Sequence, residues 1–217
     1  MEEKIFLLLG EEIKKLPLAP EDQLSKAAIR SLARYTNLLN KWNQAYNLTA
    51  VRNPEEMVKK HIIDSLSILP VLIKAFRPGS SPRLVDIGSG AGLPGIPLAI
   101  ARPDWNVTLV DSNNKKTGFL NHVKQELGLS NVTVVNARAE SIKQSYDAIV
   151  CRALASLDDI IELTKGLWHE STVLWAMKGK YPDEELRQLP KSYRVSATYA
   201  LDVPGVDAER HLLKIIR

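Results

Sequence analysis

The stretch RLVDIGSGAGLPG, residues 83–95, decides the fold of this chain. Its first five residues form an apolar run with the length of a buried strand. The glycines that follow allow a tight turn and a close approach of the backbone to a ligand, and Pro94 suits the first turn of a helix. Strand, glycine-rich turn and helix in this order predict one unit of a parallel α/β sheet.

The same alternation of short apolar runs and helical segments continues along the chain. The further buried strands expected are 106–111, 131–135, 146–151 and 172–177, and the helices expected are 95–102, 115–128, 157–167 and 182–188. No helix separates the last two runs, 193–201 and 210–216, so they predict an antiparallel hairpin at the sheet edge. The predicted fold class is therefore α/β, with a doubly wound, mostly parallel sheet of seven strands and an antiparallel C-terminal hairpin.

The residues before this region predict helices and no strands. Apolar side chains recur every three or four residues from Leu24 to Trp42, as in an amphipathic helix, and the segment 20–22 offers it an acidic first turn. A second helix is expected over 54–69, with Asn53 as its N-cap. The stretch 77–82, rich in Pro, Gly and Ser, separates the two patterns. We therefore expect an N-terminal helical extension, residues 1–78, followed by the α/β domain, residues 79–217.

The composition is that of an ordinary globular protein. The 217 residues include 29 Lys and Arg against 25 Asp and Glu, which gives a formal net charge of +4, and 45% are hydrophobic. A single cysteine excludes an internal disulfide framework and a zinc site built from cysteines. The early apolar run Ile5–Leu9 is too short for a membrane span or a signal peptide. These features predict a soluble, cytoplasmic protein with no membrane partner, and we expect a monomer.

Two classes of cofactor compete for the glycine-rich turn. Residues 90–95 satisfy the G-x-G-x-x-G pattern of dinucleotide-binding proteins, but this match begins three residues past the strand. Counted from Gly88, the sixth position is Leu93, so the pattern fails where it should begin. Asp86, at the strand end, would repel a pyrophosphate but favours the cationic ammonium and sulfonium groups of S-adenosylmethionine. The turn therefore favours S-adenosylmethionine over NAD, and the glycines expected to contact it are Gly88, Gly90 and Gly92.

Positions at the ends of the next two strands suit the same cofactor. Asp111 ends the second predicted strand, 25 residues after Asp86, where an acid can bind both hydroxyls of a ribose. Ala139 and Glu140 follow the third strand, where a backbone group and a carboxylate could meet an adenine ring. An acid in such a loop is more often only solvated. From the residues alone, Glu140 is therefore either an adenine contact or a solvated surface side chain.

The residues after the fourth and fifth predicted strands suit a methyl acceptor. Cys151 is the one candidate nucleophile for methylation of a pyrimidine at carbon 5, but it continues an apolar run and is better explained as an inert core thiol. Arg152 follows at the mouth of the expected site, where a guanidinium can contact a phosphate, a base or a carboxylate, and Lys178 and Lys180 add cations. No catalytic triad or carboxylate pair is visible. Guanine N7 needs neither, because its lone pair can attack an activated methyl group without loss of a proton.

Four motifs, spread over nearly the whole chain, resemble one family. They are Trp42-Asn43-x3-Asn47-Leu48-Thr49, His61-x2-Asp64-Ser65-Leu66, the segment from Asp86 to Ala99, and Arg152-Ala153-x-Ala155. The first two lie outside the expected cofactor fold, so a general similarity to methyltransferases does not explain them. The sequence resembles the bacterial small-subunit (16S) ribosomal RNA guanine-N7 methyltransferases, also called the glucose-inhibited division protein B family.

This resemblance implies a Rossmann-like class I S-adenosylmethionine-dependent methyltransferase. Its implied acceptor is N7 of a guanine in 16S ribosomal RNA, either as naked RNA or within the small ribosomal subunit. The resemblance also places Arg152 in the active site, and it is our catalytic candidate. The cofactor-binding residues expected from the residues and the resemblance together are Asp86, Gly88, Gly90, Gly92, Leu93, Asp111, Ala139, Glu140 and Arg152.

Some alternatives stay open. His61, Asp64 and Ser65 could share one helix face and either fix that helix against the cofactor domain or contact the substrate. The basic side chains that could bind RNA phosphates are Arg52, Lys59, Lys60, Arg77, Arg102, Lys115, Lys116, Lys178 and Lys180. The competing functions are a methyltransferase for a small molecule or a protein, an NAD-dependent oxidoreductase, and a non-catalytic RNA-binding module.

Overall fold

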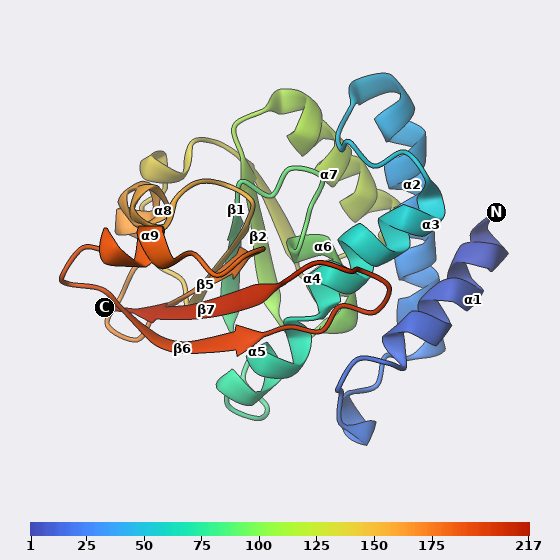
Figure 1. The fold of residues 1–217 in the computed structure, drawn as a ribbon. Helices are drawn as coiled ribbons and strands as arrows, with labels where there is room; N and C mark the ends of the chain where they lie inside the picture. The colour runs from blue at the N-terminus through green and yellow to red at the C-terminus, as the bar shows by residue number, and fades with distance from the viewer.

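The computed structural model describes residues 1–217 and contains one seven-stranded sheet (Figure 1). The strands are β1 (Arg83–Ile87), β2 (Asn106–Asp111), β3 (Val132–Asn136), β4 (Ala148–Arg152), β5 (Val173–Lys178), β6 (Arg194–Ala200) and β7 (His211–Ile216). Their order across the sheet is β3-β2-β1-β4-β5-β7-β6. The pairings from β3 to β5 are parallel, whereas β7 pairs antiparallel with both β5 and β6. The predicted doubly wound sheet with its C-terminal hairpin is confirmed.

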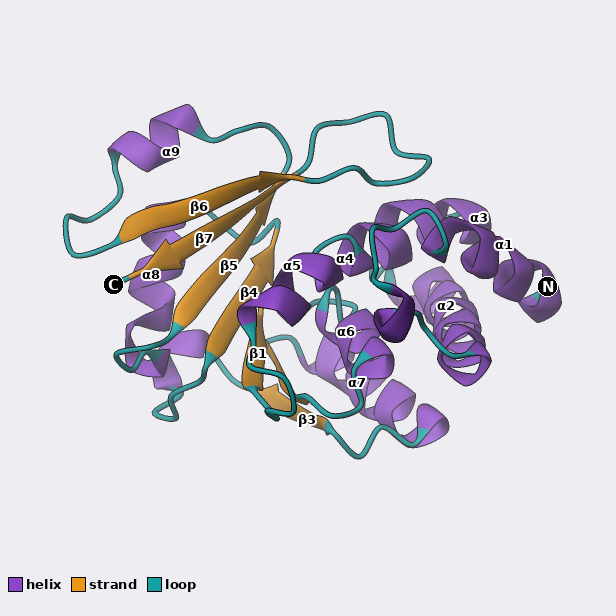
Figure 2. Ribbon diagram, turned by 90° about the horizontal axis from the view of Figure 1, so that it is seen from below, coloured by secondary structure: helices purple, strands orange, loops and turns teal.

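Helices cover both faces of this sheet (Figure 2). One face carries α1 (Glu2–Ile13), α2 (Lys26–Tyr46), α5 (Leu69–Ala75), α6 (Gly95–Ala101) and α7 (Asn114–Leu127), together with the segment from α3 (Pro54–Met57) to α4 (Asp64–Leu66). The other face carries α8 (Leu157–Thr164), the 3-10 turns η3 (Ala139–Ser141) and η4 (Lys165–Leu167), and α9 (Asp183–Arg187). Each βα unit therefore buries its helix against the sheet that it helps to build.

Two apolar clusters hold the layers together, one on each face, because successive residues of a strand point to opposite sides. Leu84 and Val150 belong to a cluster of 37 buried residues, and Val85 and Ile149 belong to a second cluster of 17. The larger cluster also contains buried side chains of α1 and α2. The N-terminal helices thus share one core with the sheet.

The N-terminal helices differ from the sequence prediction at two places. The segment Pro20–Asp22 forms a separate 3-10 turn (η1), and α2 begins only at Lys26, where the Ser25 hydroxyl accepts a hydrogen bond from Ala28 N–H (3.1 Å). The helix predicted over 54–69 does begin at Pro54 after the Asn53 cap, but it passes through a π-helical turn, η2 (Val58–Ile63), and ends at α4. A new helix, α5, starts beyond it with Pro70 in its first turn.

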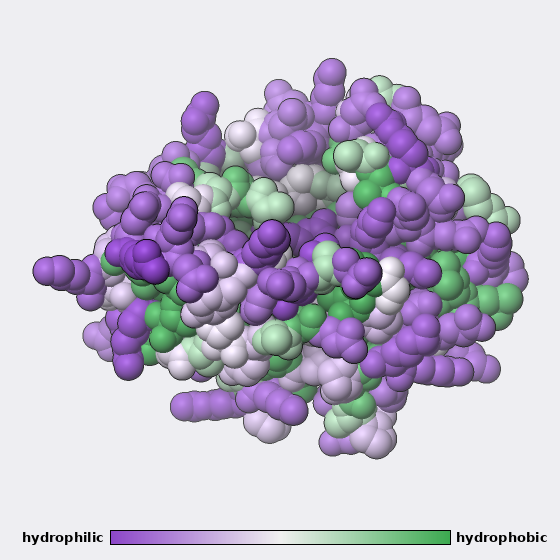
Figure 3. All heavy atoms as spheres, viewed as in Figure 1, coloured by the Kyte–Doolittle hydropathy of each residue, from purple (hydrophilic) through white to green (hydrophobic).

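The order of the strands fixes where a ligand can bind. Chain connections run outward from β1 in one direction and from β4 in the other, so a crevice opens between the carboxyl ends of these two neighbouring strands. In space-filling form, the side of the molecule seen in Figure 1 is mostly hydrophilic and is hollowed near its centre (Figure 3). None of the helices combines the length and the apolar character needed to span a bilayer.

Candidate active site at the carboxyl ends of the strands

The glycine-rich turn after β1 uses its three glycines in different ways. All three have positive φ: +66° at Gly88, +57° at Gly90 and +93° at Gly92. A Cβ at Gly88 would overlap the side chain of Leu154, and one at Gly92 would lie 2.5 Å from Ile96 Cγ1. A Cβ at Gly90 would meet nothing closer than the Gly88 carbonyl oxygen at 3.8 Å. A side chain at Gly88 or Gly92 would therefore disturb the packing around the turn, whereas one at Gly90 would enter open space.

Asp86, the acid at the end of β1, is fully buried beneath this turn. Its Oδ2 accepts a hydrogen bond from Gly95 N–H at the start of α6 (2.8 Å), while its Oδ1 has no partner. Burial raises the pKa of Asp86 to about 7, although the Gly95 hydrogen bond and the charge of Arg152 act in the opposite direction. Asp86 thus fastens the helix to the strand, and only its second oxygen is left to act on a ligand.

This buried carboxyl should make the stability of the ligand-free protein depend on pH. Because its pKa is raised on folding, the folded chain holds a proton that the unfolded chain has released between about pH 4 and pH 7, so Asp86 lowers the free energy of unfolding as pH rises. Asp86→Asn removes this loss. We expect the variant to melt several degrees above the parent near pH 8, since roughly 1 kcal/mol corresponds to about 2–4 °C at this size, and to show a smaller gain near pH 5. Thermal unfolding at both pH values measures the difference, and an equal gain at both would contradict the assignment.

Asp111, the acid at the end of β2, holds the turn from the other side. Its Oδ2 accepts from Gly90 N–H (2.9 Å), its Oδ1 accepts from Asn113 N–H (2.9 Å), and Lys116 lies 3.7 Å away. Each carboxylate oxygen can accept a second hydrogen bond. Asp111, which the sequence predicts to bind the ribose hydroxyls, therefore also positions Gly90, the glycine that borders open space.

The remaining predicted cofactor contacts lie at the same edge with different exposure. Leu93 is buried in the core below the turn, and its N–H donates to Ser89 O (3.0 Å). Ala139 is buried and Glu140 is exposed in η3, directly after β3. The structure thus brings these positions to one edge of the sheet without assigning a ligand to any of them.

The N-terminal helices reach this turn through one buried side chain. The hydroxyl of Tyr35 in α2 donates to Ala91 O in the turn (2.6 Å), and burial raises the pKa of Tyr35 far above its usual range. In the sequence, Tyr35 lies within the apolar stripe that runs from Leu24 to Trp42, and nothing there indicates this contact. The hydroxyl gives the N-terminal extension a direct role in shaping the turn.

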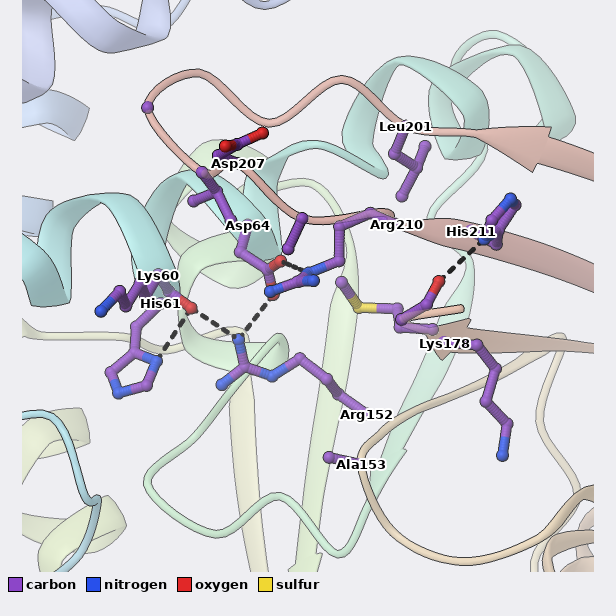
Figure 4. Close-up of a pocket in the computed structure, with 15 residues that line it drawn as sticks. Lys60, His61, Asp64, Arg152, Ala153, Lys178, Leu201, Asp207, Arg210 and His211 are labelled. Atoms are coloured by element: carbon purple, nitrogen blue, oxygen red, sulfur yellow. Dashed lines mark hydrogen bonds and ion pairs between the residues drawn. The ribbon is translucent and has the colours of Figure 1, made fainter. Parts of the chain in front are cut away.

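A cavity of about 670 Å³ opens at the same edge of the sheet, bounded by the ends of β4 and β5, the η2–α4 segment and the loop before β7 (Figure 4). Arg152 and Arg210 point into it, and both contact Asp64. Asp64 Oδ2 accepts from Arg152 Nη1 (2.8 Å), and Asp64 Oδ1 accepts from Arg210 Nε (2.6 Å). Sequence reasoning singled out Arg152 and Asp64 but missed Arg210.

Strand alternation explains why the two arginines meet. Ala148 and Val150 face the larger core, so Arg152 faces the same side, towards α4. Leu212 also faces this side, and Arg210 lies two residues before it, directly ahead of β7. Met177 of β5 pairs with Arg152 on one side and with Leu212 on the other. This pairing brings the ends of β4 and β7 within reach of the Asp64 carboxylate.

The other predicted cations do not all gather at this site. Lys178 borders the cavity, but its ammonium is engaged elsewhere, donating to Ala155 O (2.9 Å) and Glu185 Oε2 (2.7 Å). Arg77 precedes β1 and Arg102 precedes β2, so both lie at the amino ends of the strands, away from the turn. Arg52 is committed to the α2 terminus, where it donates to Asn43 O and Asn47 Oδ1. The basic positions at the carboxyl edge are Lys59, Lys60, Lys115, Lys116, Lys178 and Lys180.

The two N-terminal motifs form one hydrogen-bonded scaffold. Asn43 bridges the loop after α2, donating to Val51 O and accepting from Thr49 N–H. The Thr49 hydroxyl lies 2.7 Å from His61 Nε2, and His61 Nδ1 lies 3.0 Å from Lys60 O, which can only accept. His61 therefore carries its proton on Nδ1, and burial together with the charge of Arg152 lowers the pKa of His61 to about 4. These residues fix the loop against η2.

The single thiol belongs to the core and not to the site. Cys151 is buried on the face opposite Arg152, and burial raises the pKa of this thiol to about 12. A thiolate is the nucleophilic form of cysteine, so this side chain is poorly suited to attack a pyrimidine. The structure supports the inert thiol expected from the sequence.

Comparison with known structures agrees with this fold. A magnesium protoporphyrin IX methyltransferase from Synechocystis, solved with bound S-adenosylmethionine, aligns with a TM-score of 0.60 over 84% of this chain and 97% of that chain, at 15% sequence identity. A ribosomal protein L11 methylase from Lactobacillus delbrueckii aligns with a TM-score of 0.53 over 71% of this chain and 76% of that one, at 16% identity. At such identities the likeness concerns the fold, which is the Rossmann-like fold of class I methyltransferases.

Comparison with known sequences is more specific. Proteins named ribosomal RNA small subunit methyltransferase G are 47% identical in Burkholderia ambifaria, over 89% of this chain and 86% of that protein, and 49% identical in Pseudomonas aeruginosa, over 87% and 86%. The one from Chromobacterium violaceum is 47% identical over 89% of this chain and 91% of its own length. The profile of the family described as GidB, rRNA small subunit methyltransferase G, matches residues 28–213. The chain therefore belongs to the rRNA small subunit methyltransferase G family.

Proposed function

We propose that this protein transfers the methyl group of S-adenosylmethionine to N7 of a guanine in 16S ribosomal RNA. It acts in the cytoplasm as a single chain, on the RNA or on the small ribosomal subunit. One observation carries the proposal: the glycine-rich turn, open at Gly90, and a nucleotide-sized cavity lined by Arg152 lie at the carboxyl ends of two neighbouring strands, β1 and β4. Family membership supports the same acceptor class.

The residues around the turn fit S-adenosylmethionine, which supplies the methyl group when bound. The unpartnered Oδ1 of Asp86 is a buried acceptor on the β1 side, suited to a cationic group nearby. Asp111 retains acceptor capacity for ribose hydroxyls, and Gly90 leaves the space that a ligand needs. We propose as cofactor-binding residues Asp86, Gly88, Gly90, Gly92, Leu93, Asp111, Ala139, Glu140 and Arg152.

The side chains at the cavity match a reaction that needs no general base. Both oxygens of Asp64 are committed to guanidinium groups, and both ring nitrogens of His61 are engaged. Guanine N7 carries a free lone pair at neutral pH, so the protein has only to orient the base with N7 in line with the methyl group. We assign this role to Arg152, which ends β4 and lines the cavity.

The proposed activity is tested by transfer of tritiated methyl groups. Small subunits and naked 16S RNA are prepared from cells that lack the protein, incubated with the purified chain, and analysed by mass spectrometry of the labelled fragment. We expect one guanine labelled at N7 and a KM for the RNA that rises with salt, since lysine and arginine displace counterions from phosphates. Label on another atom, or no label on either acceptor, would refute the proposal, and comparison of the two acceptors identifies the true substrate.

Asp111→Asn should weaken S-adenosylmethionine binding roughly tenfold or more, because a hydrogen bond to a charged group contributes about 1.5–3 kcal/mol. Asparagine keeps an acceptor for Gly90 N–H or Asn113 N–H, so the turn should persist. Titration calorimetry measures the affinity. Asp104→Asn, an acid at the opposite edge of the sheet that pairs with Arg102, is the control and should leave affinity unchanged. Equal affinity in Asp111→Asn and the parent would remove Asp111 from the site.

A further inference from the structure

We propose that Asp64 is a positioning residue that holds Arg152 and Arg210 together as one unit facing the acceptor cavity. The inference rests on the proposed function and assigns a role to the acid whose part the sequence left open. Asp64 does not itself meet the acceptor in this assignment. It acts through the two guanidinium groups that it orients.

The geometry joins three separate parts of the fold at one carboxylate. Asp64 begins α4, Arg152 ends β4, and Arg210 directly precedes β7, so the contacts span 88 and 146 residues of chain. The Asp64 side chain is 4% exposed, against 18% for Arg152 and 26% for Arg210. The carboxylate is therefore the most enclosed of the three groups, and Figure 4 shows both guanidinium groups lying against it.

The π-helical turn η2 contributes to the same arrangement. Arg152 Nη1 donates both to Asp64 Oδ2 (2.8 Å) and to Lys60 O (3.3 Å), a carbonyl within η2. Such turns are rare and often occur at functional sites. Here the turn presents a backbone acceptor and, directly after it, the carboxylate of Asp64 to one guanidinium.

The two arginines keep donors for a ligand. Their contacts use Nη1 of Arg152 and Nε and Nη1 of Arg210, the last of these to Glu209 O (2.8 Å). A guanidinium carries five N–H donors, so each Nη2 is uncommitted, and both residues line the cavity. Two cations against one buried anion leave a net positive charge at this cluster, which suits an oxygen acceptor of RNA. A phosphate oxygen or guanine O6 fits, because a donor placed on N7 would occupy the lone pair that must react.

The test is a double-mutant cycle between Asp64 and Arg210, with kcat and KM measured for methylation of the small subunit. We expect Asp64→Asn to lower kcat/KM at least about tenfold, and Asp64→Glu, which keeps the charge, to recover part of the loss. Arg210→Lys should lower kcat/KM in the parent but add little in the Asp64→Asn background, because the arginine there has already lost its orientation. Asp104→Asn is the control and should keep parental kinetics.

A structural role alone predicts a different pattern. In that case Arg210→Lys would lower kcat/KM by the same factor in both backgrounds, and this additive result would overturn the proposal, as would parental kinetics in folded Asp64→Asn. If Asp64→Asn does not fold, the cycle is run with Asp64→Glu and judged in the same way. Failure of the proposed function is distinct, because the unmutated protein would then not label guanine N7 at all.

Discussion

Gly90→Val should bind S-adenosylmethionine about 100-fold more weakly than the parent or not detectably, a loss of roughly 3 kcal/mol or more, while the chain still folds. The nearest protein atom to a Cβ at this position is 3.8 Å away, so the valine displaces nothing in the core. Its side chain instead fills the open space beside Asp111, where the cofactor is proposed to bind. Titration calorimetry measures the affinity, and thermal unfolding reports the fold.

A matched control separates this effect from backbone strain. Gly90 has φ +57°, where a β-branched residue is strained, and Gly128, the C-cap of α7, has φ +63° with no atom within 4 Å of a built Cβ. Gly128→Val should thus lose similar stability but keep parental affinity. Gly92→Ala should instead destabilise the fold, because its Cβ would lie 2.5 Å from Ile96 and 2.8 Å from Leu120. Parental affinity in Gly90→Val would show that the open space is not the cofactor site.

The sequence predicted the sheet well because its signals are local. The parallel strands are short apolar runs bounded by polar or turn residues, and the glycine-rich turn marks the β1–α6 junction by residue type alone. The segment 54–69 failed as one helix because periodicity does not reveal a π-helical turn, and because Pro70 starts a new helix. Pro20–Asp22 failed as a first turn because Ser25 is the better cap.

The site was less predictable because its contacts are long-range. Asp86 was expected to face a cationic ligand, yet one of its oxygens holds Gly95 N–H, a partner nine residues on that no spacing rule selects. Arg210 lies 146 residues from Asp64, and its role follows only once β7 is known to pair with β5. Three glycines of similar appearance in the sequence have different surroundings, because a side chain at Gly88 or Gly92 would meet core side chains and one at Gly90 would not. The sequence motifs indicated that the site lies at the carboxyl ends of the strands. The contacts of each side chain there follow only from the packing of the folded chain.

Arg152→Ala should lower kcat/KM for methylation about 100-fold without unfolding the protein, since charge-assisted hydrogen bonds to a substrate contribute about 1.5–3 kcal/mol. The fold should survive because Asp64 retains its contact with Arg210 Nε and is not left as an unpaired buried charge. Arg152→Lys should be faster than Arg152→Ala but slower than the parent. An ammonium keeps the positive charge, but it lacks the planar set of donors with which a guanidinium binds two acceptors at once. Single-turnover methylation of the small subunit gives the rate, and thermal unfolding confirms the fold.

The adjacent residue supplies the control for this experiment. Cys151 lies on the same strand but faces the opposite core, and its thiol is buried with a raised pKa. Cys151→Ala should therefore keep near-parental turnover, with at most a modest loss of stability from the vacated volume. If Cys151→Ala lost activity while Arg152→Ala kept it, the acceptor would bind on the Cys151 side of β4 and not on the Arg152 side. Methylation would then have to proceed through a cysteine adduct at a pyrimidine. Loss with Arg152→Ala alone places the acceptor on the α4 side of the sheet, where N7 can attack the methyl group without any proton being removed first.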